Sequence, residues 1–424
     1  MPANALHVRS PAWVWLICGI LFLATFVNYG NRVTVPQRSV EIIKTFETDR
    51  EGYGHAEKQF GYGFACGGLL FGVLADWISI RWLYPLVVII WSAAGIASGQ
   101  AATLEQFGVC RFVLGLFEAG HWPCSLRMTQ RTFLPHERTR GNGILQSGAS
   151  VAQVFVPLML IRLDPWDSSG WRLSCGIMGF LGLPWVMLWL ASVRERDVLR
   201  PVIQTDEQAD GTGSSQELHE VPLWRIFISR RWWLLLLTVV CVNVPWHYIR
   251  VWMPDTLRAD HGYATEFVDD FTAVYYLFTF FGSLSVGWII SWLAHQGWNV
   301  HRARLVVFGG CAVMVACAVP AAFQPRGLGL LALLCVIAFG SLGLAPIYYS
   351  FNQELSGKNQ GKVGGSLSFL LWLILGAMQG EIGTLVKNDP AVRPYLFAAV
   401  GLLPVIACAA LVLFWGKRAR INNH

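Results

Sequence analysis

The sequence predicts an all-α membrane protein with twelve transmembrane helices in two pseudo-symmetric six-helix bundles. Three observations favour this fold class. Of the 424 residues, 54% are hydrophobic and only 14% are charged, which is typical of a chain with a large lipid-facing surface. Apolar stretches of roughly 20 residues, long enough to cross about 30 Å of hydrocarbon, recur along the whole chain. One long polar segment divides these stretches into two equal sets.

Each predicted span is an apolar window between polar breaks. The windows lie near residues 12–35, 58–80, 83–101, 104–127, 141–162, 174–193, 232–254, 269–294, 304–323, 327–351, 363–386 and 394–415. Lys and Arg are more frequent in the connections on the side of the N-terminus. This bias, together with an even number of spans, places both termini in the cytoplasm.

The polar segment between the sixth and seventh spans divides the chain into domains. We expect an N-terminal bundle over residues 1–193, a cytoplasmic linker over 194–231 and a C-terminal bundle over 232–424. The linker is rich in Gln, Glu, Asp, Gly and Ser, which favours a flexible segment. Such a division suits a protein in which two bundles rock about a central site.

Several classes of protein are excluded by composition. The net charge of +6 is spread over short connections and forms no basic face, so we expect no nucleic-acid partner. The ten cysteines make no CxxC pair and most lie in apolar stretches, where thiols act as small hydrophobes. We therefore expect no metal and no cofactor. We also find no nucleophile–base pair among the loop residues, so the chain is not expected to be an enzyme or to have catalytic residues.

Four charged residues lie inside predicted spans, namely Arg32, Arg111, Glu118 and Arg250. A charge in hydrocarbon costs at least about 2.5–3.5 kcal/mol, so each must face a partner or a wet cavity. Three of the four are arginines, and a guanidinium group can hold a carboxylate through two parallel hydrogen bonds. The expected substrate is a small anionic solute. An Arg111 side chain that snorkels toward the interface is the alternative for that residue.

Polar and aromatic residues near these charges are further candidates for substrate binding. Amides and aromatic faces suit a polyhydroxylated substrate, although any one aromatic is more often a packing residue. These candidates lie in the first, seventh and tenth spans: Asn28, Tyr29, Trp246, His247, Tyr348, Tyr349 and Asn352.

Glu118 is the candidate for proton coupling. Arg111 and Glu118 are seven residues apart, so they share a helix face about 10 Å apart along the axis. A carboxylate in a low-dielectric cavity near an arginine can gain and lose a proton during a transport cycle. The alternative is a static ion pair that only holds the N-terminal bundle together. His121 is a weaker candidate for proton relay, because a histidine near a span end is more often satisfied by water or backbone.

The connection between the second and third spans carries the gating candidates Gly72, Asp76 and Arg81. Gly72 would allow two helices to pack closely, and Asp76 could meet the positive N-terminal end of a neighbouring helix. Arg81 would anchor the turn. Such a connection is suited to holding a gate closed on the cytoplasmic side.

The pattern from Gly72 to Arg81 resembles the loop motif of the major facilitator superfamily. The resemblance to this superfamily extends over essentially the whole chain. Other segments resemble the anion:cation symporter family of that superfamily: Asn28-Tyr29-Gly30-Asn31-Arg32, Arg111 with Glu118-Ala-Gly-His121-Trp122-Pro123, His136-Glu137-Arg138, and Ala345-Pro346-Ile347-Tyr348-Tyr349. This resemblance implies proton-coupled uptake of sugar acids or related carboxylates by alternating access. It also implies roles for Arg32, Tyr62, Arg111 and Glu118, which match the family positions.

The chain departs from the family pattern at several positions. Asn31 stands where bacterial members usually have Asp, so one titrating acid is missing and proton coupling depends on Glu118 alone. A family Gln falls at Ala149 and a family Asn near Ser368, so the substrate range is expected to differ from that of the familiar members. Arg250 is an additional cation that could accept a second carboxylate. Trp77 and Ser79 replace a basic residue and a glycine of the loop motif.

The leading hypothesis is therefore a proton-coupled organic-anion symporter, functional as a monomer in the lipid bilayer of a bacterial inner membrane. An efflux transporter of the same fold for other small molecules is the alternative, but three intramembrane arginines oppose the binding of cations. A non-transporting nutrient sensor would need a signalling extension, and the linker and tails look too short for one.

Overall fold

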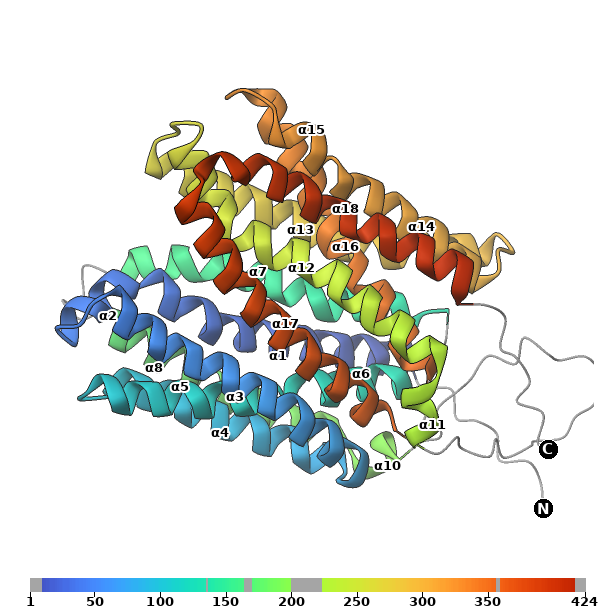
Figure 1. Ribbon diagram of the computed structural model, residues 1–424. Helices are drawn as coiled ribbons and strands as arrows, with labels where there is room; N and C mark the ends of the chain where they lie inside the picture. Colours follow the sequence, from blue (N-terminus) through green and yellow to red (C-terminus); the bar gives the residue numbers. More distant parts are fainter. Residues whose placement is uncertain (1–9, 135, 164–169, 200–222, 356–358, 416–424) are drawn as a thin grey trace, which may run out of the picture.

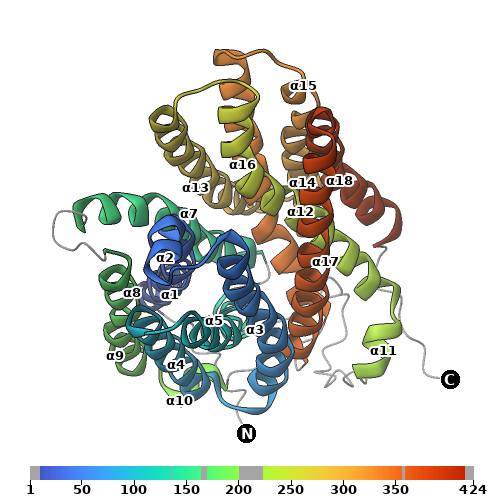
Figure 2. The same ribbon diagram turned by 60° about the vertical axis from the view of Figure 1, so that its left-hand side comes forward.

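The computed structural model describes residues 10–134, 136–163, 170–199, 223–355 and 359–415, and every regular element within these ranges is a helix. The long helices lie side by side in two groups, as Figures 1 and 2 show. We call the end of the molecule at which α1 begins and α3 and α18 end the linker end, because the short helices α10 and α11 also lie there.

The first group of helices spans the predicted N-terminal bundle. Its elements are α1 (Pro11–Gln37), α2 (Ser39–Thr45), α3 (Arg50–Trp77), α4 (Ile80–Gln100), α5 (Leu104–Glu118), α6 (His121–Thr132), α7 (Arg138–Leu163), α8 (Gly170–Phe180) and α9 (Gly182–Ser192). The helix starts follow capping signals, since Ser10, Asp49, Ser79 and Thr103 each accept a hydrogen bond from a backbone N–H in the first turn.

The second group spans the predicted C-terminal bundle. Its elements are α12 (Arg230–Ala259), α13 (Thr265–His295), α14 (Val300–Ala316), α15 (Ala318–Ala322), α16 (Leu328–Leu355), α17 (Gln360–Asn388), the short 3₁₀ helix η2 (Pro390–Val392) and α18 (Arg393–Phe414). Two short helices, α10 (Glu195–Val198) and α11 (Leu223–Ile228), fall inside the predicted linker. Residues 200–222, the most polar part of that linker, lie outside the described residues.

Among the described residues, ten helical segments are long and apolar enough to cross a membrane. The predicted spans 104–127 and 141–162 are not among them. The first is broken at Ala119–Gly120 into α5 and α6, and α6 is polar in sequence although most of its side chains are buried. The second, α7, packs against α1, α13 and α16. A helix surrounded by other helices does not need the apolar surface that lipid demands, which explains why both fall short.

The two groups meet along two pairs of helices, α3 with α17 and α7 with α13 (Figure 2). Glycines allow both contacts. A Cβ atom added to Gly72 would lie 2.6 Å from the carbonyl oxygen of Gly361, and one added to Gly143 would lie 2.3 Å from that of Ser283. Because a side chain at either glycine would collide with backbone, the helices can approach this closely only where it is absent.

Candidate functional site

A cavity lies between the two groups of helices. From the first group it is lined by Tyr29, Arg32, Phe64, Gly68, Ala119, Trp122, Pro123 and Leu126, and from the second by Val239, Asn243, His247, Tyr348, Tyr349, Asn352, Gln360, Gly364, Leu367, Ser368, Leu371 and Trp372. We call it the central cavity.

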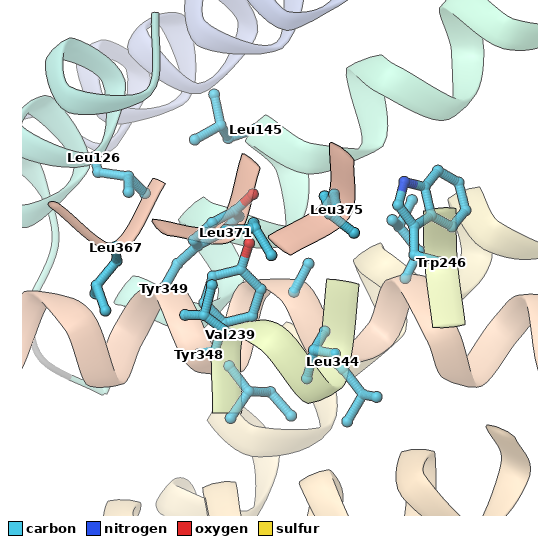
Figure 3. Close-up of a cluster of buried hydrophobic side chains, with 14 of the residues drawn as sticks. Leu126, Leu145, Val239, Trp246, Leu344, Tyr348, Tyr349, Leu367, Leu371 and Leu375 are labelled. Atoms are coloured by element: carbon cyan, nitrogen blue, oxygen red, sulfur yellow. The ribbon is translucent and has the colours of Figure 1, made fainter. Parts of the chain in front are cut away.

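A smaller cavity adjoins the central cavity and shares five lining residues with it. Gln146 of α7 and Trp246 of α12 contribute to this cavity only. The hydroxyl of Tyr349, one of the shared residues, donates a hydrogen bond of 3.0 Å to Oε1 of Gln146 and so joins the two groups of helices. Figure 3 shows Tyr348 and Tyr349 side by side, with Trp246 at the other side of the cluster.

Arg32 is the only Arg, Lys, Asp or Glu among the described residues that line either cavity. Its guanidinium carbon lies 4.5 Å from the ring centre of Phe64, 4.8 Å from that of Tyr29 and 5.9 Å from that of Trp372. Aromatic faces stabilise a cation at these distances. The sequence hypothesis of an arginine turned toward a shared chamber fits this placement of Arg32.

Glu118 does not line the cavity but forms an ion pair with Arg32. Its Oε2 lies 3.4 Å from Nε and 3.3 Å from Nη2 of Arg32, and the Glu118 side chain is fully buried. Asn28 supports the pair, because its Oδ1 accepts from Arg32 Nη2 at 3.2 Å and its Nδ2 donates to the Glu118 carbonyl at 3.2 Å. Within the part of the chain that the structure describes, Oε1 of Glu118 has no hydrogen-bond partner. The carboxylate therefore keeps one acceptor unused within reach of the cavity arginine.

Arg111 does not line either cavity, contrary to the expectation that it faces the chamber with Arg32. It is fully buried between α3 and α5, where its Nε lies 2.8 Å from Oε1 of Glu57 and its Nη2 donates to Oε2 of Glu57 at 3.0 Å. The guanidinium carbon also lies 4.5 Å from the ring centre of Phe60. Glu57 is the partner that sequence reasoning missed, because its position before the hydropathy window of the second span gave no sign of a buried ion pair.

Tyr62 lies outside both cavities and is 48% exposed. Two residues along a helix rotate the side chain by about 200°. Since Phe64 of the same helix faces the central cavity, Tyr62 points away from it. The structure thus separates Tyr62 from Arg32, with which the family resemblance groups it.

The candidates on α12 are divided by position along the helix. His247 lines both cavities, whereas Arg250 lies one turn beyond them. Nη2 of Arg250 is 3.4 Å from Nδ1 of His247, and no described residue forms a hydrogen bond with its buried Nε. Arg250 therefore adjoins the site without lining it.

His121 is enclosed within the N-terminal group of helices. Its Nε2 is 3.1 Å from the hydroxyl of Thr25, its Nδ1 is 2.7 Å from that of Tyr84, and the side chain is fully buried. Both ring nitrogens are engaged, as expected for the alternative of a structurally satisfied histidine. The next residue, Trp122, lines the central cavity, whereas His121 does not.

Two of the three gating candidates lie where the groups of helices meet at the linker end. Asp76 accepts hydrogen bonds of 2.9 Å from the backbone N–H groups of Gly361 and Lys362, at the N-terminus of α17, and it pairs with Arg127. A carboxylate is favoured there by the helix dipole. Gly72 packs against the same helix. Arg81 lies elsewhere, donating to the carbonyl of Val193 at the end of α9.

A second set of polar contacts at the linker end was not foreseen. Gln353 of α16 donates to the carbonyl of Leu126 at 2.8 Å and to the hydroxyl of Thr129 at 2.7 Å, and its Oε1 accepts from Asn142 at 3.0 Å. The hydroxyl oxygens of Thr139 and Ser350 are 2.9 Å apart and share a hydrogen bond. We call this set the amide latch. Polar residues inside predicted spans were a usable signal for it, but the partners are more than 200 residues apart in sequence.

Other lining residues were also missed. Asn243, Gln360 and Trp372 line the central cavity, and Gln146 lines the smaller one, one turn before Ala149. Ser368, at the position where the family has Asn, lines the central cavity as well. Ala149 itself is buried in packing. The family Gln falls at Ala149, and this chain has the amide of Gln146 about one helical turn earlier.

Comparison with known proteins decides the family. The sequence pattern of the Major Facilitator Superfamily matches residues 17–380, most of the chain. The chain belongs to the major facilitator superfamily. It is similar to the D-galactonate transporter of Escherichia coli O6:H1, with 22% identity covering 99% of this chain and 97% of that protein. The hexuronate transporter of Escherichia coli K12 is 21% identical and covers 87% of this chain and 88% of its own.

Solved structures share the fold of this major facilitator protein. The proton:xylose symporter XylE bound to 6-bromo-6-deoxy-D-glucose superposes with a TM-score of 0.76 at 13% identity, covering 96% of this chain and 97% of XylE. The human organic anion transporter MFSD10 gives a TM-score of 0.67 at 12% identity, covering 95% and 100%. The predicted fold class is thereby confirmed, and the chain is a multi-pass membrane transporter and not an enzyme.

Proposed function

We propose that the protein carries small organic anions, with sugar acids as the leading class, and couples each one to a proton. The observation that carries the proposal is Arg32, a cation in an otherwise uncharged cavity at the boundary of the two groups of helices. The name of the D-galactonate transporter and that of the hexuronate transporter support sugar acids as substrates. The amides of Asn243 and Asn352 add donors and acceptors for hydroxyl groups.

Coupling follows from competition for Arg32. The carboxylate of Glu118 and the carboxylate of a substrate are alternative partners for the same guanidinium group. When Glu118 takes up a proton, its attraction for Arg32 falls, and Arg32 can bind the substrate. When the substrate leaves on the other side, Arg32 attracts Glu118 again and the proton is released.

Charge balance gives one proton for each carboxylate. Arg111 is neutralised by Glu57, and Arg32 by Glu118. Asn31, at the family's acidic position, is uncharged and donates to the carbonyl of Val27 at 3.1 Å. Protonating Glu118 therefore leaves one positive charge at Arg32, which one carboxylate cancels. The charge of Arg250 beside the site is the same in both states. A buried net charge is costly, so the set of Arg32, Glu118 and substrate is most stable when it is neutral.

Transport would proceed by alternating access of two bundles, residues 1–193 and 232–424, about the central cavity. The contacts at Asp76 and in the amide latch close the linker end. We assign the linker end to the cytoplasm, from the excess of Lys and Arg in its connections. The protein would then act as a monomer in a bacterial inner membrane, with both termini inside.

Uptake into proteoliposomes tests this function. An inward proton gradient should drive accumulation of radiolabelled galactonate or glucuronate by the wild-type protein, and Arg32→Gln should abolish it. Arg302→Gln is the matched control, because Arg302 is exposed and outside the cavities. Accumulation of a lipophilic cation instead of these anions, or anion uptake that survives Arg32→Gln, would contradict the proposal.

A further inference from the structure

The central cavity is elongated along α17. That helix lines it with Gln360, Gly364, Leu367, Ser368, Leu371 and Trp372, which recur on one helix face. Twelve residues separate the first from the last, which corresponds to roughly 18 Å at 1.5 Å per residue. Arg32 lies at the Trp372 end, with its guanidinium carbon 5.9 Å from the indole ring centre. A hexuronate held by Arg32 would leave much of this length unfilled.

The far end of the cavity carries amide groups without partners. Gln360 is 1% exposed, and neither Oε1 nor Nε2 has a hydrogen-bond partner among the described residues. Asn352 is 4% exposed, and its Oδ1 also has none. Both residues line the cavity. Because buried polar groups in proteins are nearly always hydrogen-bonded, these atoms indicate a ligand group that supplies the missing bonds.

A glycine brings the two amides into one place. A Cβ atom added to Gly364, one turn after Gln360, would lie 3.3 Å from Nδ2 of Asn352. The Asn352 side chain therefore lies against α17 in the space that a larger residue would take. The amides of Gln360 and Asn352, on α17 and α16, thus offer both acceptors and donors at the linker end of the cavity.

The stretch between the two ends is mainly apolar. Leu126 and Leu367 lie at one side of the cluster in Figure 3, and Leu371, Val239 and the two tyrosines continue toward its centre. The rings of Tyr348 and Tyr349 are 4.4 Å apart. Flat aromatic and aliphatic surfaces suit the face of a sugar ring or another compact, weakly polar body.

We propose that Gln360 and Asn352 form a second subsite, which binds the neutral, hydrogen-bonding end of an elongated monocarboxylate. This inference rests on the proposed function, because it places the acid group of the same substrate at Arg32. Hydroxyl and amide groups are the chemistry that fits, since each can donate and accept. A second acid group does not fit, because no cation among the described residues lines this end of the cavity. The preferred substrates are thus acids extended by a further sugar or a similar neutral unit.

Two commercially available acids form a matched pair for the test. Lactobionate is gluconate extended by one neutral galactosyl unit, so both probes present the same aldonate acid. Binding of each to the purified full-length protein is measured by titration calorimetry. We expect lactobionate to bind at least about tenfold more tightly than gluconate, the value of one or two net hydrogen bonds.

Variants then locate the extra affinity. Gln360→Leu should reduce lactobionate binding to about the level of gluconate while leaving gluconate binding unchanged. Asn352→Leu should weaken lactobionate binding by a larger factor than gluconate binding. Gln324→Leu, at an exposed position away from the cavity, should change neither. Unchanged gluconate binding also shows that a variant is folded. Arg32→Gln should abolish binding of both acids.

Each contrary outcome has one meaning. If gluconate binds through Arg32 but lactobionate binds no better, or if Gln360→Leu weakens both acids equally, the second subsite is overturned and the proposed function stands. If neither acid binds, or if both bind independently of Arg32, the proposed function fails and the subsite fails with it.

Discussion

Arg32 and Glu118 form the buried ion pair that gives the site its chemistry. A buried pair is rarely a gain in stability, because removing two charges from water costs about as much as their attraction returns. Here the pair adjoins a cavity, and one carboxylate oxygen of Glu118 has no partner. Arg111 and Glu57 form a comparable pair away from the cavity. The pair of Arg32 and Glu118, beside the cavity, is thus suited to exchange partners. The pair of Arg111 and Glu57, away from the cavity, is suited to join α3 and α5.

Replacing Glu118 with Gln tests the exchange of partners. The variant should lose accumulation of galactonate driven by a proton gradient, because the amide cannot bind and release the proton. It should retain galactonate exchange between the two sides, and bind galactonate more tightly than the wild type at neutral pH, because Arg32 no longer has a competing anion. Proteoliposome uptake and counterflow measure the two activities. Accumulation and exchange that survive equally would mean that Glu118 only holds the bundle together.

At the scale of elements, the contact between α3 and α17 depends on the absence of side chains. Gly72 lies against Gly361 and Gly365, and Asp76, one turn later, accepts from the first N–H groups of α17. The close approach of α3 to α17 and the capping of α17 by Asp76 therefore occur at the same place. The same pairing of helices leaves α17 with one face toward the cavity, so the contact with Asp76 and part of the cavity lining belong to one helix.

Gly72→Ala should disrupt that contact, with Gly61→Ala as its control in the same helix. A Cβ at Gly72 would lie 2.6 Å from a carbonyl oxygen, whereas nothing lies within 4 Å of one at Gly61. We expect Gly72→Ala to destabilise the closed arrangement by about 2 kcal/mol, the usual cost of overpacking, and to slow uptake. Gly61→Ala should behave as the wild type. Equal melting temperatures and equal uptake rates for the two variants would contradict the close contact.

At the scale of the whole molecule, transport by alternating access requires the two groups of helices to separate at the linker end. The amide latch joins α6 and α7 to α16, and its donors and acceptors satisfy one another across the boundary. These bonds connect uncharged groups, each of modest net value, so the amide latch can open without separating an ion pair. The two bonds that Asp76 accepts from α17 are the charge-assisted part of the closed end.

A disulfide across the latch tests whether separation is needed. The hydroxyl oxygens of Thr139 and Ser350 are 2.9 Å apart, a spacing compatible with a disulfide. The double variant Thr139→Cys with Ser350→Cys, made after removal of the ten native cysteines, should stop galactonate uptake when oxidised and recover it in reductant. Either single variant is the control. Full uptake by the oxidised, cross-linked protein would rule out opening at this end.

The sequence by itself determined the helical membrane architecture, because the need to cover about 30 Å of hydrocarbon leaves a long, local and repetitive signal. It also singled out Arg32 and Glu118, because a charge inside a span needs a partner or a wet cavity. Of the aromatic candidates, Tyr29, Trp246, Tyr348 and Tyr349 line the cavities. Only the tertiary structure decided which arginine meets the cavity, that Arg111 belongs to Glu57, and that Tyr62 points away. The amides of Gln353, Gln360 and Asn142 likewise acquired meaning only in space. These are contacts between helices distant in sequence, and their partners follow from how helices rotate and pack, which no local pattern encodes.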